Sequence, residues 1–402
     1  MDGTGGSPPW QWLAAVAGEH GDGFYLIDPA AARTCIGAIR QQFGKAVGPV
    51  QLAYSYKTNH TPALCRLARE QGMSAEVASA QELWLARSIG VPDADIILTG
   101  VGRGPDVVHS ALAAGSLVVI DGQRDADMVI EFASRHREET VAHVLLRVAV
   151  PTPAAPAPRL GMQPDEAVAL GRRLMDMPGV DVLGLHCHNV DRSLPGMRAR
   201  LAVLGAVGQE LWPFGPRLLD LGSPLGPFDP AHAEDHIAPY ANAAASALTS
   251  LGWADTHLIL EPGAAIVAAA VSLVARVLDV RQQPGRAVAT IAASILHSSP
   301  NTRRVDLPVQ HVPASGPPRV TGADPVYLAG STLIDGDWLA IDLPWSVLPG
   351  DFVVVQSVGA YSISLDNSFI DPPLPVVIRD GAGWATVRRR PSFEESFAGF
   401  VL

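Results

Sequence analysis

The stretch AYSYKTN, residues 53–59, is an apolar segment that ends in one positive charge, at Lys57. If the segment is a strand of a parallel barrel, Lys57 lies at its C-terminal mouth, where enzymes of that fold place their chemistry. Desolvation there lowers the pKa of an amine and allows it to form a Schiff base with a carbonyl group. Position alone leaves the ordinary alternative open, in which Lys57 simply faces solvent.

On both sides of this stretch, short apolar runs alternate with amphipathic segments, from about residue 24 to residue 270. The runs predicted to be strands are Val50–Tyr56, Ser74–Val77, Ile96–Leu98, Leu117–Ile120, Ala142–Val150, Val180–His188, Arg217–Leu221 and His257–Glu261. The helical segments between them include Thr61–Gln71, Ala80–Ile89, Gln123–His136, Pro164–Met177 and Ser193–Leu211. Buried strands separated by helices predict an α/β fold, a closed parallel (β/α)8 TIM barrel over residues 24–270.

The pattern changes after residue 270, where β-forming segments are separated by Gly and Pro turns. These segments are Val271–Gln282, Ala287–Ala292, Pro325–Leu328, Trp338–Ile341, Asp351–Ser357 and Pro375–Arg379. We therefore expect a C-terminal antiparallel β domain over residues 271–402, with residues 1–23 packing on it. Two stretches, Pro151–Pro158 and Gln310–Pro318, are expected to be loosely ordered; the first is as consistent with an active-site loop as with a plain surface loop.

Composition excludes several classes of partner. The 402 residues carry a formal net charge of −11 without a long Lys/Arg run, which argues against nucleic acid and anionic membranes. The N-terminus lacks the basic and apolar regions of a secretory signal, and the longest apolar run, Ala264–Ala275, is too short to span a bilayer. Three scattered cysteines, Cys35, Cys65 and Cys187, do not form a disulfide framework. We expect a cytoplasmic protein with reduced thiols.

Four further segments carry residues suited to chemistry, each with a plain structural alternative. In GLHCH, His186 and His188 share one strand face, but no third ligand stands at metal-ligand spacing, so no metal site is expected. The turn DLGSPLG, residues 220–226, can cup a phosphate with backbone N–H groups or be an ordinary loop. Glu261 in EPG needs a cationic partner, either a ligand or a structural Arg. Tyr361 in GAY can reach a ligand or pack in a turn.

Taken in order, these segments resemble motifs of the fold-type III pyridoxal 5′-phosphate (PLP) enzymes: diaminopimelate, ornithine and arginine decarboxylases, with an alanine-racemase-like barrel. The resemblance covers nearly the whole chain. YSYKTN is similar to Y-x-V-K-A-N, AEVASAQEL (Ala75–Leu83) to D-V-x-S-x-x-E-L, and RLG (Arg159–Gly161) to K/R-F-G. GLHCH matches G-L-H-x-H, LDLGSPLG resembles L-D-x-G-G-G-x-G, and EPG matches the start of E-P-G-R. LPGD (Leu348–Asp351) and GAY match late β-domain motifs.

This resemblance implies a divergent amino-acid decarboxylase, a carboxy-lyase with PLP as its cofactor and typically a homodimer with active sites at the subunit interface. It assigns Lys57 to the internal aldimine, His188 to stacking on the cofactor ring, and Glu261 to pairing with the pyridine nitrogen. Glu76 would lie under the cofactor near its lysine end. The implied phosphate contacts are Gly222, Ser223, Gly226 and Tyr361.

Departures from the family pattern cluster at the phosphate and in one β-domain loop. Ala264 stands where an Arg follows E-P-G, Asp191 stands where a phosphate-binding Ser is expected, and Pro224 removes a backbone donor. We name three arginines as candidate replacements: Arg192, Arg303 and Arg304.

The second departure is in GSTLIDGD (Gly330–Asp337). Leu333 occupies the position of a cysteine that acts as an acid in the decarboxylases, and Ile334 the position of an acidic residue that recognises diamino acids. Leucine cannot donate a proton.

Three hypotheses follow from these observations. The first is a PLP-dependent decarboxylase; the second is another PLP reaction, such as racemisation or epimerisation, which the loss of the cysteine favours. The third is a non-catalytic homologue with a damaged cofactor site. The loss of the acidic residue at Ile334 favours a small, apolar or carrier-tethered amino acid over a basic one. Arg159 is either a partner for a substrate carboxylate or a structural residue.

Overall fold

The computed structural model describes residues 8–136, 140–298, 306–317, 319–320, 324–366 and 369–401. The chain divides into two compact units, Arg33–Ala265 and Met1–Ala32 with Ile266–Leu402. We call the first the barrel unit and the second the β unit. The chain therefore crosses from one unit to the other twice, once in the first turn of α2 (Pro29–Val47) and once in the short helix α10 (Ala264–Val267).

Eight parallel strands close the barrel in sequence order, each hydrogen-bonded to the next and β9 to β2. They are β2 (Gln51–Ser55), β3 (Ser74–Val77), β4 (Ile96–Leu98), β5 (Leu117–Ile120), β6 (Ala142–Arg147), β7 (Val180–His186), β8 (Leu218–Asp220) and β9 (His257–Leu260). Their inward apolar side chains, including Ala53, Ile97, Val119, Leu145 and Ile259, pack into one buried cluster. This filled interior leaves the polar residues at the strand ends as the lining of the barrel mouth.

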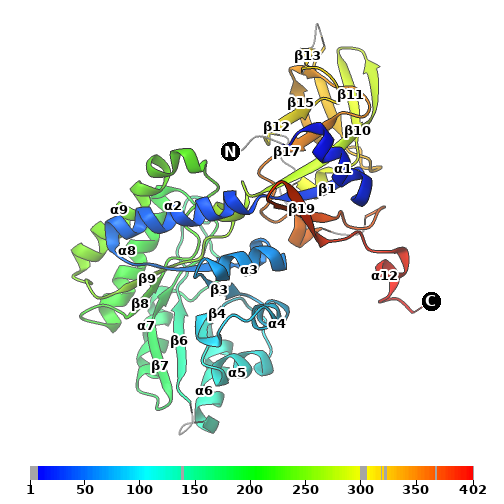
Figure 1. Cartoon of the computed structure of the whole chain (residues 1–402). Coiled ribbons are helices and arrows are strands. Elements are labelled where there is room, and N and C mark those ends of the chain that lie inside the picture. The colour runs from blue at the N-terminus through cyan, green and yellow to red at the C-terminus, as the bar shows by residue number, and fades with distance from the viewer. Residues whose placement is uncertain are drawn as a thin grey trace. The chain divides into compact units, whose positions relative to one another are not determined.

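Helices follow the strands and cover the barrel (Figure 1). Besides α2 they are α3 (Pro62–Glu70), α4 (Ala80–Ser88), α5 (Pro105–Ala113), α6 (Gln123–His136), α7 (Pro164–Met175), α8 (Leu194–Leu211) and α9 (Ala233–Leu251). Single-turn 3₁₀ helices are η1 (Tyr56–Thr58), η2 (Asp93–Asp95) and η3 (Pro230–His232). Several helices begin with Pro in the first turn, where the missing N–H needs no partner, and Ser79 and Ser193 cap α4 and α8 with their hydroxyls.

The β unit is built on a nine-stranded sheet in the order β15-β14-β11-β10-β1-β18-β19, with β17 paired to β10 and β12 paired to β17. Its strands are β1 (Gly23–Ile27), β10 (Val271–Gln283), β11 (Arg286–Ile291), β12 (Val309–Val312), β14 (Val326–Ala329), β15 (Trp338–Leu343), β17 (Phe352–Val355), β18 (Val376–Asp380) and β19 (Gly383–Arg388). A separate ladder joins β13 (Arg319–Val320) to β16 (Trp345–Ser346). Helix α1 (Trp10–His20) buries Leu13 and Val16 against Phe352. The remaining short helices are α11 (Ile295–Ser298), η4 (Ile363–Leu365) and α12 (Phe393–Phe397).

The α/β fold class is confirmed, with three corrections. First, β1 pairs with β10 and β18 in the sheet, so the segment after residue 24 belongs to the β unit and not to the barrel. Second, the sheet is antiparallel-rich but not wholly antiparallel, because β1–β18 and β11–β14 are parallel pairs. Third, β12 begins one residue before Gln310–Pro318, which was expected to be loosely ordered, and overlaps its first three residues, where pairing with β17 supplies hydrogen bonds. Among the described residues, no helix is long and apolar enough to cross a membrane.

Candidate active site at the mouth of the barrel

Every strand of the barrel delivers a polar side chain at or just after its C-terminal end. In strand order these residues are Lys57, Glu76, Thr99, Asp121, Arg147, His186, Asp220 and Glu261. The register aligns three of them in neighbouring strands, because Arg147 is paired with His186 and His186 with Asp220. In parallel strands the C-terminal ends meet at one mouth, and this mouth is where barrel enzymes hold their ligands.

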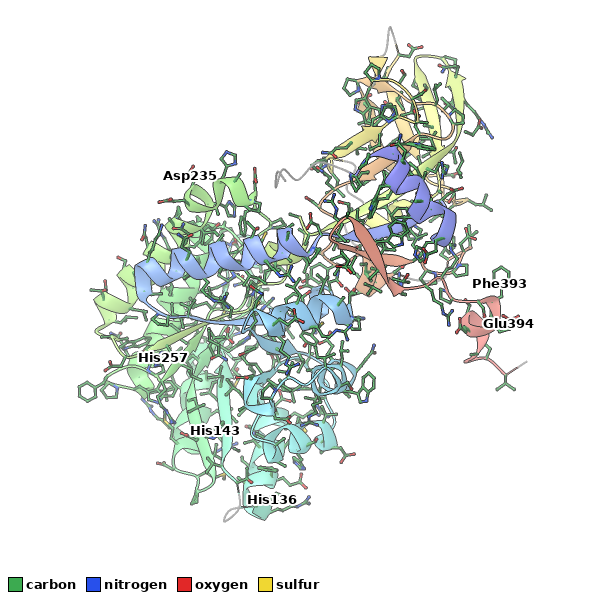
Figure 2. All side chains as sticks on the ribbon, in the orientation of Figure 1. His136, His143, Asp235, His257, Phe393 and Glu394 are labelled. Carbon is green, nitrogen blue, oxygen red and sulfur yellow. The ribbon has the colours of Figure 1, made fainter. Side chains whose placement is uncertain are left out.

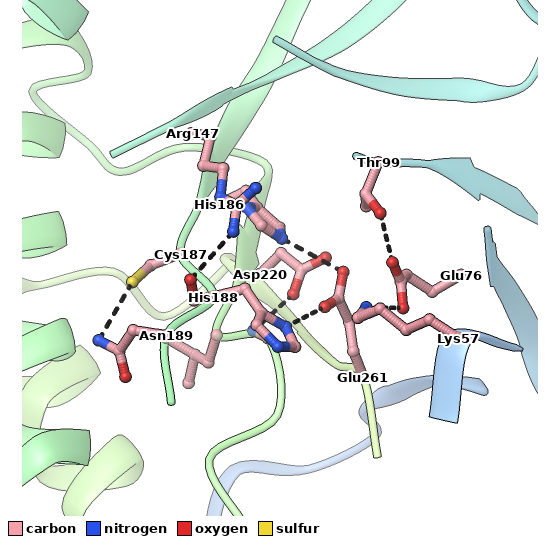
Figure 3. Close-up of polar contacts among 12 residues, drawn as sticks. Lys57, Glu76, Thr99, Arg147, His186, Cys187, His188, Asn189, Asp220 and Glu261 are labelled. Carbon is pink, nitrogen blue, oxygen red and sulfur yellow. Dashed lines mark hydrogen bonds and ion pairs between the residues drawn. The ribbon is translucent and has the colours of Figure 1, made fainter. Parts of the chain in front are cut away.

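Lys57 lies in η1, one turn beyond β2, and its ammonium group forms an ion pair with Glu76 of β3 (Figure 3). The other oxygen of Glu76 accepts a hydrogen bond from the hydroxyl of Thr99, which follows β4. Glu76 is 1% exposed, whereas the Lys57 side chain is 31% exposed. The Lys57 amine is therefore accessible to solvent, and the buried Glu76 carboxylate fixes its position.

Glu261, which follows β9, is fully buried and accepts hydrogen bonds from two imidazoles (Figure 3). Nε2 of His186 lies 3.2 Å from Oε1, and Nδ1 of His188 lies 2.8 Å from Oε2. Because an ionised carboxylate only accepts, both of these ring nitrogens carry the proton. The two histidines share one side of the mouth, as the alternation along β7 predicts.

Burial and neighbouring charges shift the pKa values of Glu261, His188 and Asp220 in different directions. Burial alone would raise the pKa of Glu261, but His186, His188 and Lys57 outweigh it and hold that pKa well below its usual range. Burial, followed by the positive charge of Lys57, lowers the pKa of His188 to about 4. Burial and the Glu261 carboxylate raise the pKa of Asp220 well above its usual range. The shifts favour a charged Glu261 beside a neutral His188, and they favour the protonated form of Asp220.

His186, Asp220 and Glu261 also present ligand atoms within 4.8 Å of one another. Asp220 and Glu261 come from the next two strands, far away in the chain, so their spacing in the sequence does not mark them as partners of the histidine pair. Such a trio could hold a metal ion by its donor types. However, Nε2 of His186 already forms a hydrogen bond with the carboxylate of Glu261. The three residues can therefore also be a buried hydrogen-bond network that needs no metal.

A second network fixes the loop after β7. Arg147 donates to the carboxylate of Asp121 at 3.0 Å and to the carbonyl oxygen of His188 at 3.0 Å. Asp121 also accepts from the backbone N–H of Gly161 at 3.1 Å. Sequence reasoning missed Arg147 and Asp121. The expected strand ran on to Val150 and so hid Arg147 inside it, whereas β6 ends at Arg147 itself.

The turn after β8 has the form of a cup. Gly222 adopts φ +60°, and a Cβ there would lie 2.5 Å from the carbonyl oxygen of Cys187, so no larger residue fits. Ser223, 5% exposed, has a buried hydroxyl without a hydrogen-bond partner among the described residues. Gly263 serves a different purpose: a Cβ on it would overlap Thr58 Oγ1, so its lack of a side chain lets the end of β9 approach η1 beside Lys57.

Three further residues singled out in the sequence do not come from the ends of barrel strands. Arg159 is exposed on the segment after β6. Tyr361 belongs to the β unit, where its backbone has φ +60°. Leu333, also in the β unit, is 90% exposed at a turn whose closing residue, Asp337, accepts from the N–H groups of Ile295 and Thr332. Arg303 and Arg304 lie outside the described residues.

Two other histidines of the barrel unit do not belong to the mouth. His143 and His257 come from the N-terminal ends of β6 and β9, so they lie toward the opposite end of the barrel; both are labelled with His136 in Figure 2. His143 pairs with Asp181 at 3.6 Å. The histidines of GLHCH, in contrast, lie at the C-terminal end of β7 and contact Glu261.

Residues 35–268 match the family model described as "Pyridoxal-dependent decarboxylase, pyridoxal binding domain". The chain belongs to this family. Diaminopimelate decarboxylase of Pseudomonas aeruginosa is 26% identical over 371 residues, which cover 88% of this chain and 87% of that protein. L-glutamyl-(BtrI acyl-carrier protein) decarboxylase of Niallia circulans is 23% identical over 406 residues, with coverage of 93% and 92%. The crystal structure of diaminopimelate decarboxylase from M. jannaschii has the same fold, with a TM-score of 0.85 at 21% identity over 96% of this chain and 94% of that one.

Membership of the pyridoxal-dependent decarboxylases makes PLP the cofactor and decarboxylation of an amino acid the general chemistry. The donor set at the mouth fits PLP. It offers a partly exposed amine at Lys57, a carboxylate at Glu261 that stays ionised, and an unpartnered hydroxyl at Ser223 in a turn that excludes side chains at Gly222. The resemblance recognised from the motifs is therefore confirmed at the level of family, fold and cofactor.

Proposed function

We propose that this pyridoxal-dependent decarboxylase attaches PLP through Lys57 and removes the α-carboxyl group of an amino acid. The observation that carries the proposal is the pairing of the Lys57 amine with buried Glu76, opposite the Glu261–His188 pair, across one barrel mouth. The chain has only two lysines, and the other, Lys45, is exposed in the last turn of α2. No other side chain can supply a primary amine.

When bound, PLP withdraws electrons from the α-carbon and so weakens the bond to the carboxyl group. Glu261 is suited to keep the pyridine nitrogen protonated, because its low pKa preserves a negative charge in a fully buried position. An ionised carboxylate has about four acceptor positions, so the two imidazoles leave room for one more donor. The raised pKa of Asp220 favours its protonated form, which avoids a second negative charge next to Glu261.

His188 is suited to lie against the cofactor ring. Its low pKa keeps the planar imidazole neutral, and its side chain is 19% exposed. Arg147 supports this position by binding the carbonyl oxygen of His188. Gly222, Ser223 and Gly226 are the proposed phosphate contacts, with Ser223 supported by its unpartnered hydroxyl. Tyr361 is proposed to close over the phosphate; a non-glycine residue at positive φ is the kind of strain that clusters at ligand sites.

The substrate is proposed to be an amino acid without a second ammonium group, either free or attached to a carrier. In the family pattern an acidic residue recognises that ammonium, and here Ile334 stands in its place. The relative from Niallia circulans is named as acting on L-glutamyl-(BtrI acyl-carrier protein), which supports including carrier-bound amino acids. Exposed Arg159 is a candidate to steer a substrate carboxylate.

The enzyme is proposed to act as a homodimer. Leu333, at the position where the family offers a cysteine to the partner's site, is 90% exposed in the single chain. A large apolar side chain held outward at the tip of an ordered turn is suited to burial in a second copy. Asp337 holds the turn in place, because it accepts hydrogen bonds from the N–H of Thr332 inside the turn and from the N–H of Ile295 in α11.

The decisive experiment is an absorbance titration with PLP followed by borohydride reduction and peptide mapping. Wild type and Lys45→Ala should both develop a band near the visible edge and carry label on the peptide with Lys57. Lys57→Ala should develop neither. A panel of free and carrier-bound amino acids then tests for release of CO₂, and a protein that binds PLP through Lys57 but releases CO₂ from none of them would count against decarboxylation.

A second candidate reaction is racemisation, favoured by Leu333, which cannot donate the proton that replaces the departing carboxyl group. Exchange of the α-proton for deuterium without loss of CO₂ would identify it. A third candidate, a non-catalytic homologue, is favoured by Ala264 and Pro224 at the phosphate cup. It predicts that no absorbance band forms with wild-type protein at any PLP concentration.

A further inference from the structure

The phosphate of PLP carries about two negative charges and is ordinarily matched by a cation as well as by hydroxyl and N–H donors. In this chain the arginine that the family pattern places after E-P-G is replaced by Ala264, which is buried. The turn after β8 contributes a serine hydroxyl but no charge. Either the cup has no cation, or another element supplies one.

Arg192 lies beside this cup. Its Cδ is 3.8 Å from the point where a Cβ on Gly226 would stand, so its side chain runs along the same turn that holds Ser223. Its backbone is held in place by Tyr240 of α9, whose hydroxyl donates to the Arg192 carbonyl oxygen at 2.8 Å. The side chain therefore projects from a fixed backbone position toward the proposed phosphate contacts.

The guanidinium group of Arg192 has an unmet hydrogen-bonding need. Its Nε is buried and has no hydrogen-bond partner among the described residues. Ser223 Oγ, on the turn that Arg192 follows, is also buried and unpartnered. Buried polar groups without partners are uncommon in folded proteins and call for a ligand or an ordered water. Two of them on adjacent loops, one cationic, are donors suited to the same anion.

Asp191 does not neutralise Arg192, although the two are neighbours in sequence. Oδ1 of Asp191 accepts from the N–H and the hydroxyl of Ser193, at 2.9 and 2.6 Å. The carboxylate lies against Gly196 in the first turn of α8, within 2.9 Å of where a Cβ on that glycine would be. The negative charge of Asp191 is thus directed at Ser193, the residue that caps α8, and it lies near a helix N-terminus, which favours it.

Arg200 of α8 holds the two cup loops together. Its fully buried guanidinium donates to the carbonyl oxygens of Asn189 and Asp191 after β7 and to that of Leu221 after β8. Its side chain also bonds Asn189 Oδ1 at 2.6 Å. These bonds fix the position from which Arg192 projects, so Arg200 is a positioning residue, and its own positive charge adds to the potential in which an anion binds.

We infer that Arg192 is the cationic contact for the phosphate group of PLP and takes the place of the arginine missing at Ala264. This assignment rests on the proposed function, since it requires PLP to bind at this mouth. It explains how the cup retains affinity for a dianion despite the change at Ala264 and the loss of a donor at Pro224.

The test compares PLP with pyridoxal, which has the same ring and aldehyde but no phosphate. Dissociation constants are measured by absorbance and fluorescence titration for wild type, Arg192→Gln, Arg192→Lys and the matched control Arg198→Gln, which removes the same charge from an exposed position on α8. One charge-assisted hydrogen bond to a phosphate corresponds to roughly a ten- to hundred-fold change in affinity. Arg192→Gln should weaken PLP by about that factor and leave pyridoxal unchanged, and Arg192→Lys should lie in between.

Each result decides between the possibilities. Equal losses for PLP and pyridoxal in Arg192→Gln would mean a general structural defect and would overturn the assignment, as would a PLP affinity equal to that of Arg198→Gln. Unaltered pyridoxal binding also proves that the variant is folded. If wild-type protein binds neither compound, the proposed function fails and the role of Arg192 fails with it; if wild type binds PLP normally and only the Arg192 effect is missing, the proposed function stands.

Discussion

At the scale of single residues, the charge of the site is decided by which members of the Glu261 cluster keep their protons. His188 is neutral at pH 7, because burial and the charge of Lys57 lower its pKa to about 4. Imidazole ¹⁵N NMR of uniformly labelled apoprotein should therefore show His188 titrating near pH 4, well below the usual value of about 6.5. His188→Gln assigns the resonance, and an inflection close to pH 6.5 would contradict the account.

The same shift gives stability a pH dependence with a definite sign. The unfolded chain protonates His188 at about pH 6.5, whereas the folded chain does so only near pH 4. This residue therefore contributes its full stabilisation above pH 6.5 and loses it as the pH falls toward 4, at about 1.4 kcal/mol per pH unit. Urea denaturation between these limits should show a shallower pH slope for His188→Gln than for wild type by about this amount; parallel slopes would refute it.

Replacing Arg147 measures how much the buried ion pair with Asp121 contributes to the stability of the protein. Removing one partner of such a pair typically costs about 3–5 kcal/mol, because the other charge remains buried. Arg147→Met should lower the free energy of unfolding by that order, since it strands Asp121 and releases the carbonyl of His188. Arg172→Met, which breaks an exposed ion pair with Glu210, should cost less than about 1 kcal/mol. Similar losses in both variants would contradict a special role for Arg147.

At the scale of elements, the barrel strands were predictable and their neighbours less so. Ser74–Val77, Ile96–Leu98 and Leu117–Ile120 were predicted with the bounds that the structure has, because short buried runs end abruptly at polar residues. Strand β1 was not predicted, and most of it fell within the expected barrel domain, since an apolar run of five residues does not reveal which sheet will pair with it. Pairing between distant segments is decided by tertiary contacts.

The residues of the site likewise include some that the sequence predicts and some that it does not. Lys57, Glu76, His188 and Glu261 were predicted from strand ends and ordered motifs, and the structure brings them together. The network behind them was missed, because a buried carboxylate such as Asp121 looks like any loop aspartate in sequence. A rule that takes the first polar residue at each apolar strand end would have found it.

The turn after β8 offers a test at this scale. Gly222→Ala forces a side chain into φ +60° and within 2.5 Å of the Cys187 carbonyl, so it should destabilise the protein by on the order of 1–3 kcal/mol and weaken PLP binding. Gly37→Ala, at an open and exposed site in α2, should instead stabilise by roughly 0.5–1 kcal/mol. Chemical denaturation and PLP titration measure both. A Gly222→Ala protein as stable as wild type would show that the turn is not constrained in this way.

At the scale of the whole molecule, one chain offers Lys57 from its barrel unit and Leu333 from its β unit. If the turn Gly330–Asp337 completes the site of a second copy, the two residues that serve one site come from different subunits. Sedimentation should then show a dimer of the 42.3 kDa chain. Leu333→Asp should retain the dimer, yet inactivate the enzyme by bringing a charge into an apolar contact.

Mixing subunits separates this arrangement from a self-contained site. Lys57→Ala and Leu333→Asp proteins, each inactive alone, should together recover about a quarter of wild-type CO₂ release when co-expressed in equal amounts, because random pairing makes half of the dimers mixed and gives each mixed dimer one intact site. Lys57→Ala with Lys57→Ala/Leu333→Asp is the matched control and should recover nothing. If Leu333→Asp is active alone, or if the first mixture stays inactive although mixed dimers are isolated, Leu333 does not act in the partner's site.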